Sequence, residues 1–107
     1  MTDFKDRERA EEAHFAMEEE QLFRIQARRN RLLGQWAAER MGLSAAEAES
    51  YAKAVVQADF EEAGDEDVIR KLLGDLVSAG IDTSEAEVRA SLEARQVEAR
   101  RQIMGES

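Results

Sequence analysis

The residue pattern that most resembles a metal site in this chain is a Glu-x-x-His step formed by Glu11 and His14. That spacing places a carboxylate and an imidazole on one face of a helix, as in the ligand sets of di-iron bundles. Such a site needs two of these steps, and the chain contains one histidine and no cysteine. We therefore interpret His14 as a solvated polar residue, and we expect neither a metal ion nor a cofactor.

An acidic run that begins at Asp59 has some of the spacing of a calcium-binding loop, because Gly64 would take the sixth position and acidic residues the third, seventh and ninth. Position 12 of such loops supplies a bidentate glutamate, and here it is Arg70. A helix that ends near Gly64, followed by a helix with an acidic first turn, explains the same residues without an ion. The run therefore predicts a helix boundary, with Asp65 as the capping residue of the second helix.

Four arginines cluster within eight residues, and they are Arg24, Arg28, Arg29 and Arg31. They form a candidate surface for phosphate groups or for an acidic partner. The structural alternative is a solvated helix face whose arginines pair with neighbouring acids. A net charge of −9 disfavours nucleic acid as the partner of this cluster, because the protein as a whole repels a polyanion.

Composition narrows the classes of function further. The chain has 107 residues, enough for one domain, and its sequence pI is near 4.7. One histidine, no cysteine and scattered serines do not assemble a nucleophile, base and orienting group, so we do not expect an enzyme. No apolar run approaches the length of a bilayer span, so we expect no membrane insertion. Proteins are the expected partners.

The absence of proline and the presence of only six glycines predict an all-α fold. Capping boxes, in which a serine and a glutamate three residues later exchange hydrogen bonds, predict helix starts at Ser44 and Ser84. Gly42, Gly64 and Gly80 are expected to end helices. The apolar face of each expected helix comprises Leu22, Ile25, Leu32, Leu33, Trp36, Ala37 and Met41; Ala48, Tyr51, Ala52, Val55, Val56 and Phe60; Val68, Ile69, Leu72, Leu73, Leu76 and Val77; and Val88, Leu92, Ala99 and Ile103.

Residues 1–20 differ from the rest of the chain. They contain eight acidic residues against three basic ones, and their apolar residues form no continuous stripe. An isolated helix of this length is marginal in water. We therefore expect a four-helix bundle over residues 21–107 with a flexible, potentially helical N-terminal arm over residues 1–20, disordered or weakly helical when free.

Several strings, in order, resemble the zeta inhibitor subunit of alphaproteobacterial F-type ATP synthases. They are FKDRERA at residues 4–10, FA at 15–16, ARRNRLLG at 27–34, WAA at 36–38, YAK at 51–53 and ADFEEAGDEDV at 58–68. The similarity extends over essentially the whole chain. It implies a four-helix bundle whose arm folds into a catalytic α/β interface of the synthase head, next to the rotor subunit γ, and blocks ATP hydrolysis.

The resemblance implies that the inhibitory arm contacts the synthase mainly through five residues, Phe4, Arg7, Glu8, Arg9 and Phe15. The protein would work in the cytoplasm, peripheral to the membrane-bound synthase. A secondary implication is weak adenine-nucleotide binding on the bundle, with the arginine cluster as the phosphate surface. The competing hypothesis is a non-catalytic helical adaptor, or a nucleotide-responsive regulatory protein, that binds its partners through the bundle face instead of the arm.

Overall fold

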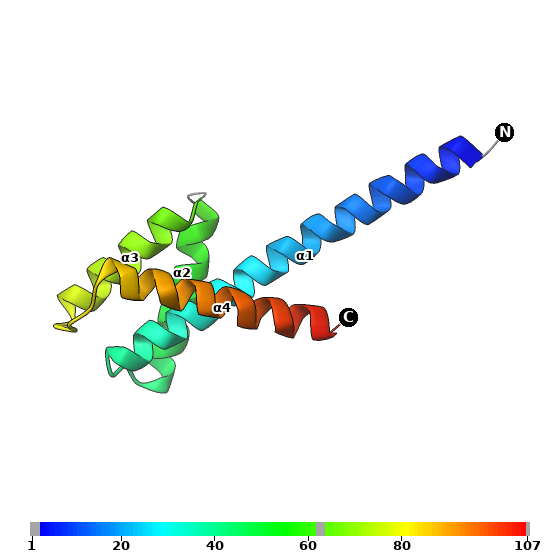
Figure 1. Cartoon of the computed structure of the whole chain (residues 1–107). Helices are drawn as coiled ribbons and strands as arrows, with labels where there is room; N and C mark the ends of the chain where they lie inside the picture. The colour runs from blue at the N-terminus through cyan, green and yellow to red at the C-terminus, as the bar shows by residue number, and fades with distance from the viewer. Residues whose placement is uncertain (1–2, 62–63, 107) are drawn as a thin grey trace.

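The computed structural model of the chain consists of four helices, α1 (Asp3–Arg40), α2 (Ala45–Glu61), α3 (Asp65–Ser78) and α4 (Glu85–Glu106). The backbone is described for residues 3–61 and 64–106, and the side chains for residues 18–61 and 64–105. α2 and α4 pack against the C-terminal half of α1, and α3 closes the bundle against α2 and α4 (Figure 1). The expected all-α four-helix bundle is confirmed.

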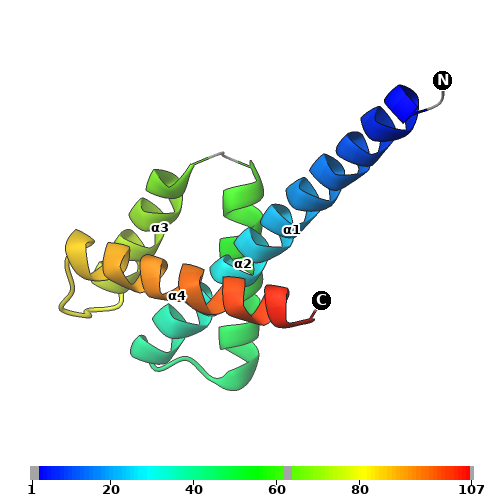
Figure 2. The same cartoon turned by 45° about the vertical axis from the view of Figure 1, so that its right-hand side comes forward.

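α1 is one continuous helix of 38 residues, so the chain has no helix break at the expected junction between arm and bundle. Its first half runs away from the other three helices, which gives the molecule its long axis of 67 Å (Figure 2). The continuity has a simple cause, because residues 1–33 contain neither glycine nor proline. The bundle therefore begins within α1, at the point where this helix first contacts the other helices, and not at a helix break.

Local signals place the helix ends. Ser44 Oγ accepts a hydrogen bond from the Glu47 amide at 3.2 Å, and the Ser44 amide donates to the Glu47 carboxylate at 3.0 Å. These two bonds confirm the first capping box, and they lower the pKa of Glu47, the backbone amide of Ser44 being the larger cause. Gly42 and Gly80 have positive φ values of 71° and 80°, as helix-terminating glycines do.

Of the two hydrogen bonds expected in the second capping box, the structure has one. The Glu87 amide donates to Ser84 Oγ at 3.2 Å, but the Glu87 carboxylate accepts from the Thr83 hydroxyl and pairs with Arg40 at 3.0 Å. Asp65, expected to cap α3, is instead its first residue, and the capping position is Gly64, without a side-chain hydrogen bond. In both places a tertiary arginine takes the carboxylate that local geometry would have used.

The core lies where all four helices meet. Its buried members come from every helix and are Leu33, Ala37, Val55, Val68, Ile69, Leu72, Leu76, Val88 and Leu92. A second small cluster of Ile25, Ala99 and Ile103, with Leu32 packed against it, joins α1 to the end of α4. Three residues expected on apolar faces are exposed instead: Leu22 and Val77 at 57% and Phe60 at 68%.

Candidate partner-binding surface

The N-terminal half of α1 stands clear of the bundle. Among the described side chains, residues 18–20 and 22–24 are exposed, and the first buried residue of the helix is Ile25, 3% exposed in contact with α4. At 1.5 Å per residue, the helix projects about 30 Å beyond that contact. The described side chains of this projection, at residues 18–20 and 22–24, therefore bury little against the bundle.

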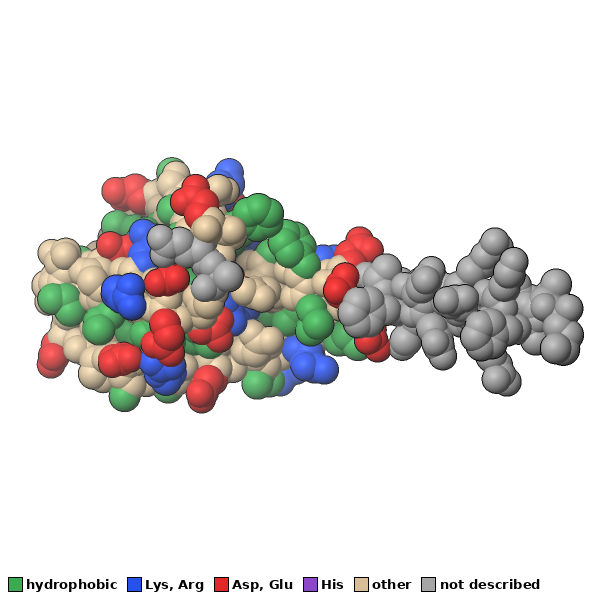
Figure 3. All heavy atoms as spheres, turned by 90° about the horizontal axis from the view of Figure 1, so that it is seen from above, with side chains coloured by type: hydrophobic (Ala, Val, Ile, Leu, Met, Phe, Trp, Pro, Cys, Tyr) green, Lys and Arg blue, Asp and Glu red, His purple; other side chains and the backbone are tan. Residues whose placement is uncertain are grey.

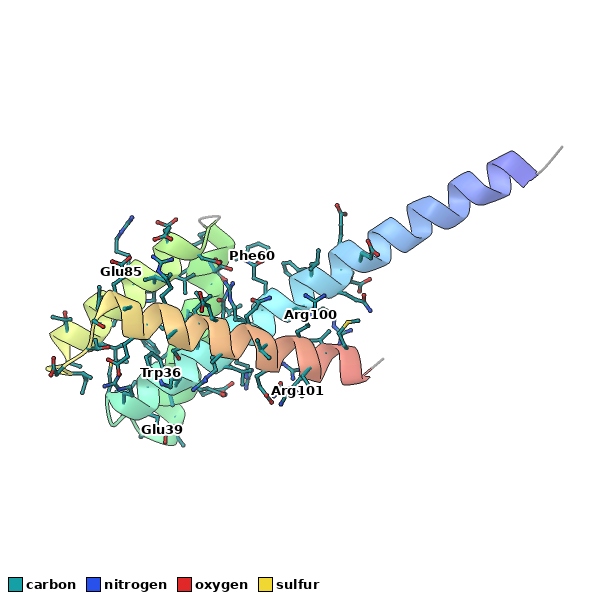
Figure 4. The ribbon with its side chains drawn as sticks, in the orientation of Figure 1. Trp36, Glu39, Phe60, Glu85, Arg100 and Arg101 are labelled. Atoms are coloured by element: carbon teal, nitrogen blue, oxygen red, sulfur yellow. The ribbon has the colours of Figure 1, made fainter. Side chains whose placement is uncertain are left out.

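At the base of this projection, three large hydrophobic side chains are exposed. Leu22 and Phe23 come from α1, and Phe60 comes from the last turn of α2. The two phenylalanine rings meet edge to face, with centroids 5.7 Å apart and planes at 83°. Figure 4 shows Phe60 beside α1, and Figure 3 shows hydrophobic side chains gathered close to where α1 leaves the bundle. Exposed aromatic side chains next to a free helix are typical of a protein-binding surface.

Sequence reasoning missed the pairing of Phe23 with Phe60. Phe23 lies off the apolar stripe of α1, and this was an available signal that its ring faces outward. Phe60 was expected in the core because it continues the α2 stripe, but the residue that turns inward there is Asp59, 8% exposed. Near the end of a helix, the spacing of apolar residues does not show which of two neighbouring residues, here Asp59 or Phe60, faces the core.

Three of the four clustered arginines border a hollow of about 500 Å³ on the bundle surface, namely Arg24, Arg28 and Arg31. Phe23, Val56 and Ile103 supply apolar walls, and Lys53 of α2 adds a fourth cation that the sequence analysis did not single out. Arg28 donates to Gln102 Oε1 at 2.7 Å, and Arg31 makes two bonds of 3.0 and 3.1 Å to the Glu49 carboxylate. We call this feature the basic hollow.

Arg29 does not belong to that surface, which corrects its place in the predicted phosphate-binding set. It is 4% exposed, and its guanidinium donates to Asp65 Oδ1 at 3.0 Å and twice to Asn30 Oδ1 at 2.9 and 3.1 Å. Its Nη2 lies 3.7 Å from Asp59 Oδ2. The arginine links α1 to α2 and to the start of α3, so its role is structural.

The expected arm contacts, Phe4, Arg7, Glu8, Arg9 and Phe15, lie outside the residues whose side chains are described, as does His14. The backbone nevertheless places all six on the projecting half of α1. Within residues 18–61 and 64–105, no group of three or more His, Cys, Asp or Glu side chains is arranged to hold a metal ion. No helix in the same part of the chain is both long and apolar enough to cross a membrane.

Comparison with known proteins decides the family. The profile of the family described as "ATPase inhibitor subunit zeta" matches residues 1–102, so the match includes the projecting half of α1 as well as the bundle. This chain belongs to the ATPase inhibitor subunit zeta family. The resemblance drawn from the sequence strings is therefore confirmed, and the family's description is that of an inhibitor subunit, which is a non-catalytic role.

A solved structure supports the fold of this zeta-family chain. A protein known by its solution NMR structure is 53% identical in sequence, and the alignment covers 79% of this chain and 96% of that one, with a TM-score of 0.69. No curated protein matches the chain.

Proposed function

We propose that this zeta-family chain inhibits ATP hydrolysis by the F-type ATP synthase, with the N-terminal arm of residues 1–20 inserted into a catalytic α/β interface beside the rotor. The observation that carries the proposal is the helix that leaves the bundle before Ile25. Family membership supplies the inhibitor role, and the projection supplies a segment that can reach into a cleft while the bundle stays outside.

The physical chemistry of the arm suits insertion. A single helix without tertiary partners is marginal in water, so the arm gains its stability from the site that it enters. Phe4 and Phe15 are the large apolar anchors of the arm, and Arg7, Glu8 and Arg9 the charged groups that pair with the walls of the cleft. Part of the binding free energy is spent on ordering the segment, which favours reversible control.

The bundle limits how far the arm can enter the cleft. The two shorter extents of the molecule, 24 and 21 Å, are about twice the diameter of a lone helix, so the bundle acts as a stop at the mouth of a cleft that admits the arm. The exposed Leu22, Phe23 and Phe60 would lie at that mouth. The complex would form in the cytoplasm, beside the membrane-bound synthase.

The deciding experiment is a titration of ATP hydrolysis by the purified cognate synthase head, with its α, β and γ subunits. We expect the full chain to inhibit and a chain lacking residues 1–20 to lose inhibition by at least about 100-fold, because the segment carries the anchors. Circular dichroism of the shortened chain should show that the bundle still folds. Inhibition by both chains would move the site to the bundle face, as the adaptor hypothesis requires, and inhibition by neither would refute the inhibitor role.

A point-variant form of the same test uses Phe4→Ala with Phe15→Ala. We expect inhibition to weaken by about 10- to 100-fold with an almost unchanged melting temperature. The matched control is Val77→Ala with Val97→Ala, two exposed bundle residues, which should retain inhibition. Equal losses of inhibition and stability would mean that the two phenylalanines are core residues.

The basic hollow supports a second function, weak binding of adenine nucleotides. Its volume of about 500 Å³ falls within the usual range of small-molecule sites, and Phe23 offers a ring for stacking beside cations for phosphate. We expect ATP and ADP to shift the resonances of this region with affinities on the order of 1 mM, more weakly after Lys53→Gln. Arg101→Gln, which removes an exposed cation outside the hollow, is the control, and an equal effect of the two variants would refute the site.

A further inference from the structure

A second cavity, of about 280 Å³, shares Phe23, Ala27 and Val56 with the basic hollow. Its floor is polar and contains a carboxylate, whereas the hollow is bordered by cations. That floor is made by Gln26, Asn30 and Asp59. Phe23 and Phe60 form aromatic walls, and both rings are more than half exposed. We call this feature the aromatic pocket.

Only one of the two carboxylate oxygens of Asp59 accepts hydrogen bonds from its neighbours. Its Oδ2 accepts hydrogen bonds from the side-chain amides of Gln26 and Asn30, both at 2.7 Å. Its Oδ1 is buried and has no hydrogen-bond partner among residues 18–61 and 64–105. A carboxylate oxygen left without a donor in the interior is costly, and natural proteins usually supply a partner for it.

The charges around Asp59 do not balance either. Arg29 is the cation that lies against it, at 3.7 Å, without a hydrogen bond to either oxygen. The same guanidinium bonds to Asp65 at 3.0 Å, so one positive charge serves two carboxylates. These three side chains therefore carry one negative charge in excess, and Asp59 lines the pocket together with the two aromatic rings.

We propose that the aromatic pocket binds the side chain of an arginine presented by a partner protein. A guanidinium is planar and carries several N–H donors, so one edge can serve Asp59 Oδ1 while its face lies against Phe23 or Phe60. The volume of about 280 Å³ is large enough for one arginine side chain and lies just below the usual range of small-molecule sites. An anionic group is disfavoured in the pocket by the uncompensated carboxylate.

The route to Asp59 that we propose runs between the two aromatic walls of the pocket. The Oδ1 atom is covered, but Phe23 and Phe60 are 57% and 68% exposed, so their rings can shift without disturbing the core. The protein's net charge of −9 adds long-range attraction for a cationic segment. This proposal concerns the bundle alone and does not depend on the insertion of the arm.

The test is an NMR titration of the full isotope-labelled chain with the capped tripeptide acetyl-Gly-Arg-Gly-amide. The matched ligand carries citrulline, which has nearly the shape of arginine but no charge. We expect saturable shifts of the Gln26 and Asn30 side-chain amides with a dissociation constant on the order of 1–10 mM, and about tenfold weaker binding of the citrulline peptide. Equal affinities for the two peptides, or no saturable shift of those amides, would overturn the proposal.

Variants locate the site. Phe60→Ala removes one exposed wall and should weaken the arginine peptide about fivefold without unfolding the chain. Asp59→Asn removes the charge and should weaken it about tenfold. Val77→Ala, at an exposed position of α3 outside the pocket, should bind as the unsubstituted chain does. If Phe60→Ala binds as tightly as the unsubstituted chain, the arginine does not occupy this pocket.

Discussion

Replacing Arg29 by methionine is expected to lower the free energy of unfolding by about 3 kcal/mol, since removal of one partner of a buried ion pair leaves an uncompensated charge. The side chains of Arg29 and Asp59 are 5% and 6% exposed. Arg29 also holds Asn30 Oδ1, so the methionine leaves a buried amide oxygen without its donor. Urea denaturation followed by far-UV circular dichroism measures the loss.

The matched control is Arg31→Met, two residues further along α1. Arg31 pairs with Glu49, and the two side chains are 46% and 42% exposed, so its replacement should change stability by no more than about 0.5 kcal/mol. Asp59→Asn reduces the penalty for losing Arg29, and in that background Arg29→Met should cost at least about 1 kcal/mol less. Equal costs for Arg29→Met and Arg31→Met would show that the buried pair is not structural.

Gly34→Ala is the second substitution with a large expected effect, a loss of about 2 kcal/mol. A Cβ at Gly34 would lie 2.7 Å from the Ala52 Cα and 3.2 Å from the Val55 Cγ2. The nearer atom belongs to the backbone of α2, so relief requires α1 and α2 to separate, which opens the core around Leu33 and Val55. This loss exceeds the gain of about 1 kcal/mol that alanine brings to a helix interior.

Gly74→Ala provides the opposite case on the same protein. Gly74 lies within α3, and a Cβ there meets nothing within 4 Å. We expect this variant to gain up to about 1 kcal/mol from helix propensity alone. Thermal and urea denaturation of both variants give the comparison. A stabilised Gly34→Ala would mean that α1 and α2 do not approach as closely as the structure has them.

The ends of the helices show which structural features can be predicted from nearby residue types. Gly42, Gly80 and the Ser44 capping box could be located from residue types alone, because each acts through atoms within four residues. The same method failed for Asp65 and for half of the Ser84 box, where Arg29 and Arg40 from α1 bind the carboxylates. Long-range charge pairs compete with local caps, and one sequence does not contain the distances that decide between them.

The candidate site divides in the same way. The strings that resemble the zeta subunit, and the lack of a continuous apolar stripe in residues 1–20, pointed to the family and to a segment without partners in its own bundle. Which of the clustered arginines is buried could not be predicted, because Arg28 and Arg29 are neighbours on one helix and differ only in which helices face them. The pairing of Phe23 with Phe60, 37 positions apart, likewise depends on the packing of α1 against α2.

The sequence by itself determined the all-α class, the number of helices, most of their ends and the family, because these follow from local propensity, capping and residue identity. Only the tertiary structure decided three other features: the burial of Arg29 with Asp59, the close approach of Gly34 to Ala52, and the aromatic pocket beneath Phe23 and Phe60. Each of these depends on the rotation of one helix about its axis relative to another. A rotation of a few tens of degrees leaves the periodic pattern intact but changes which side chains meet.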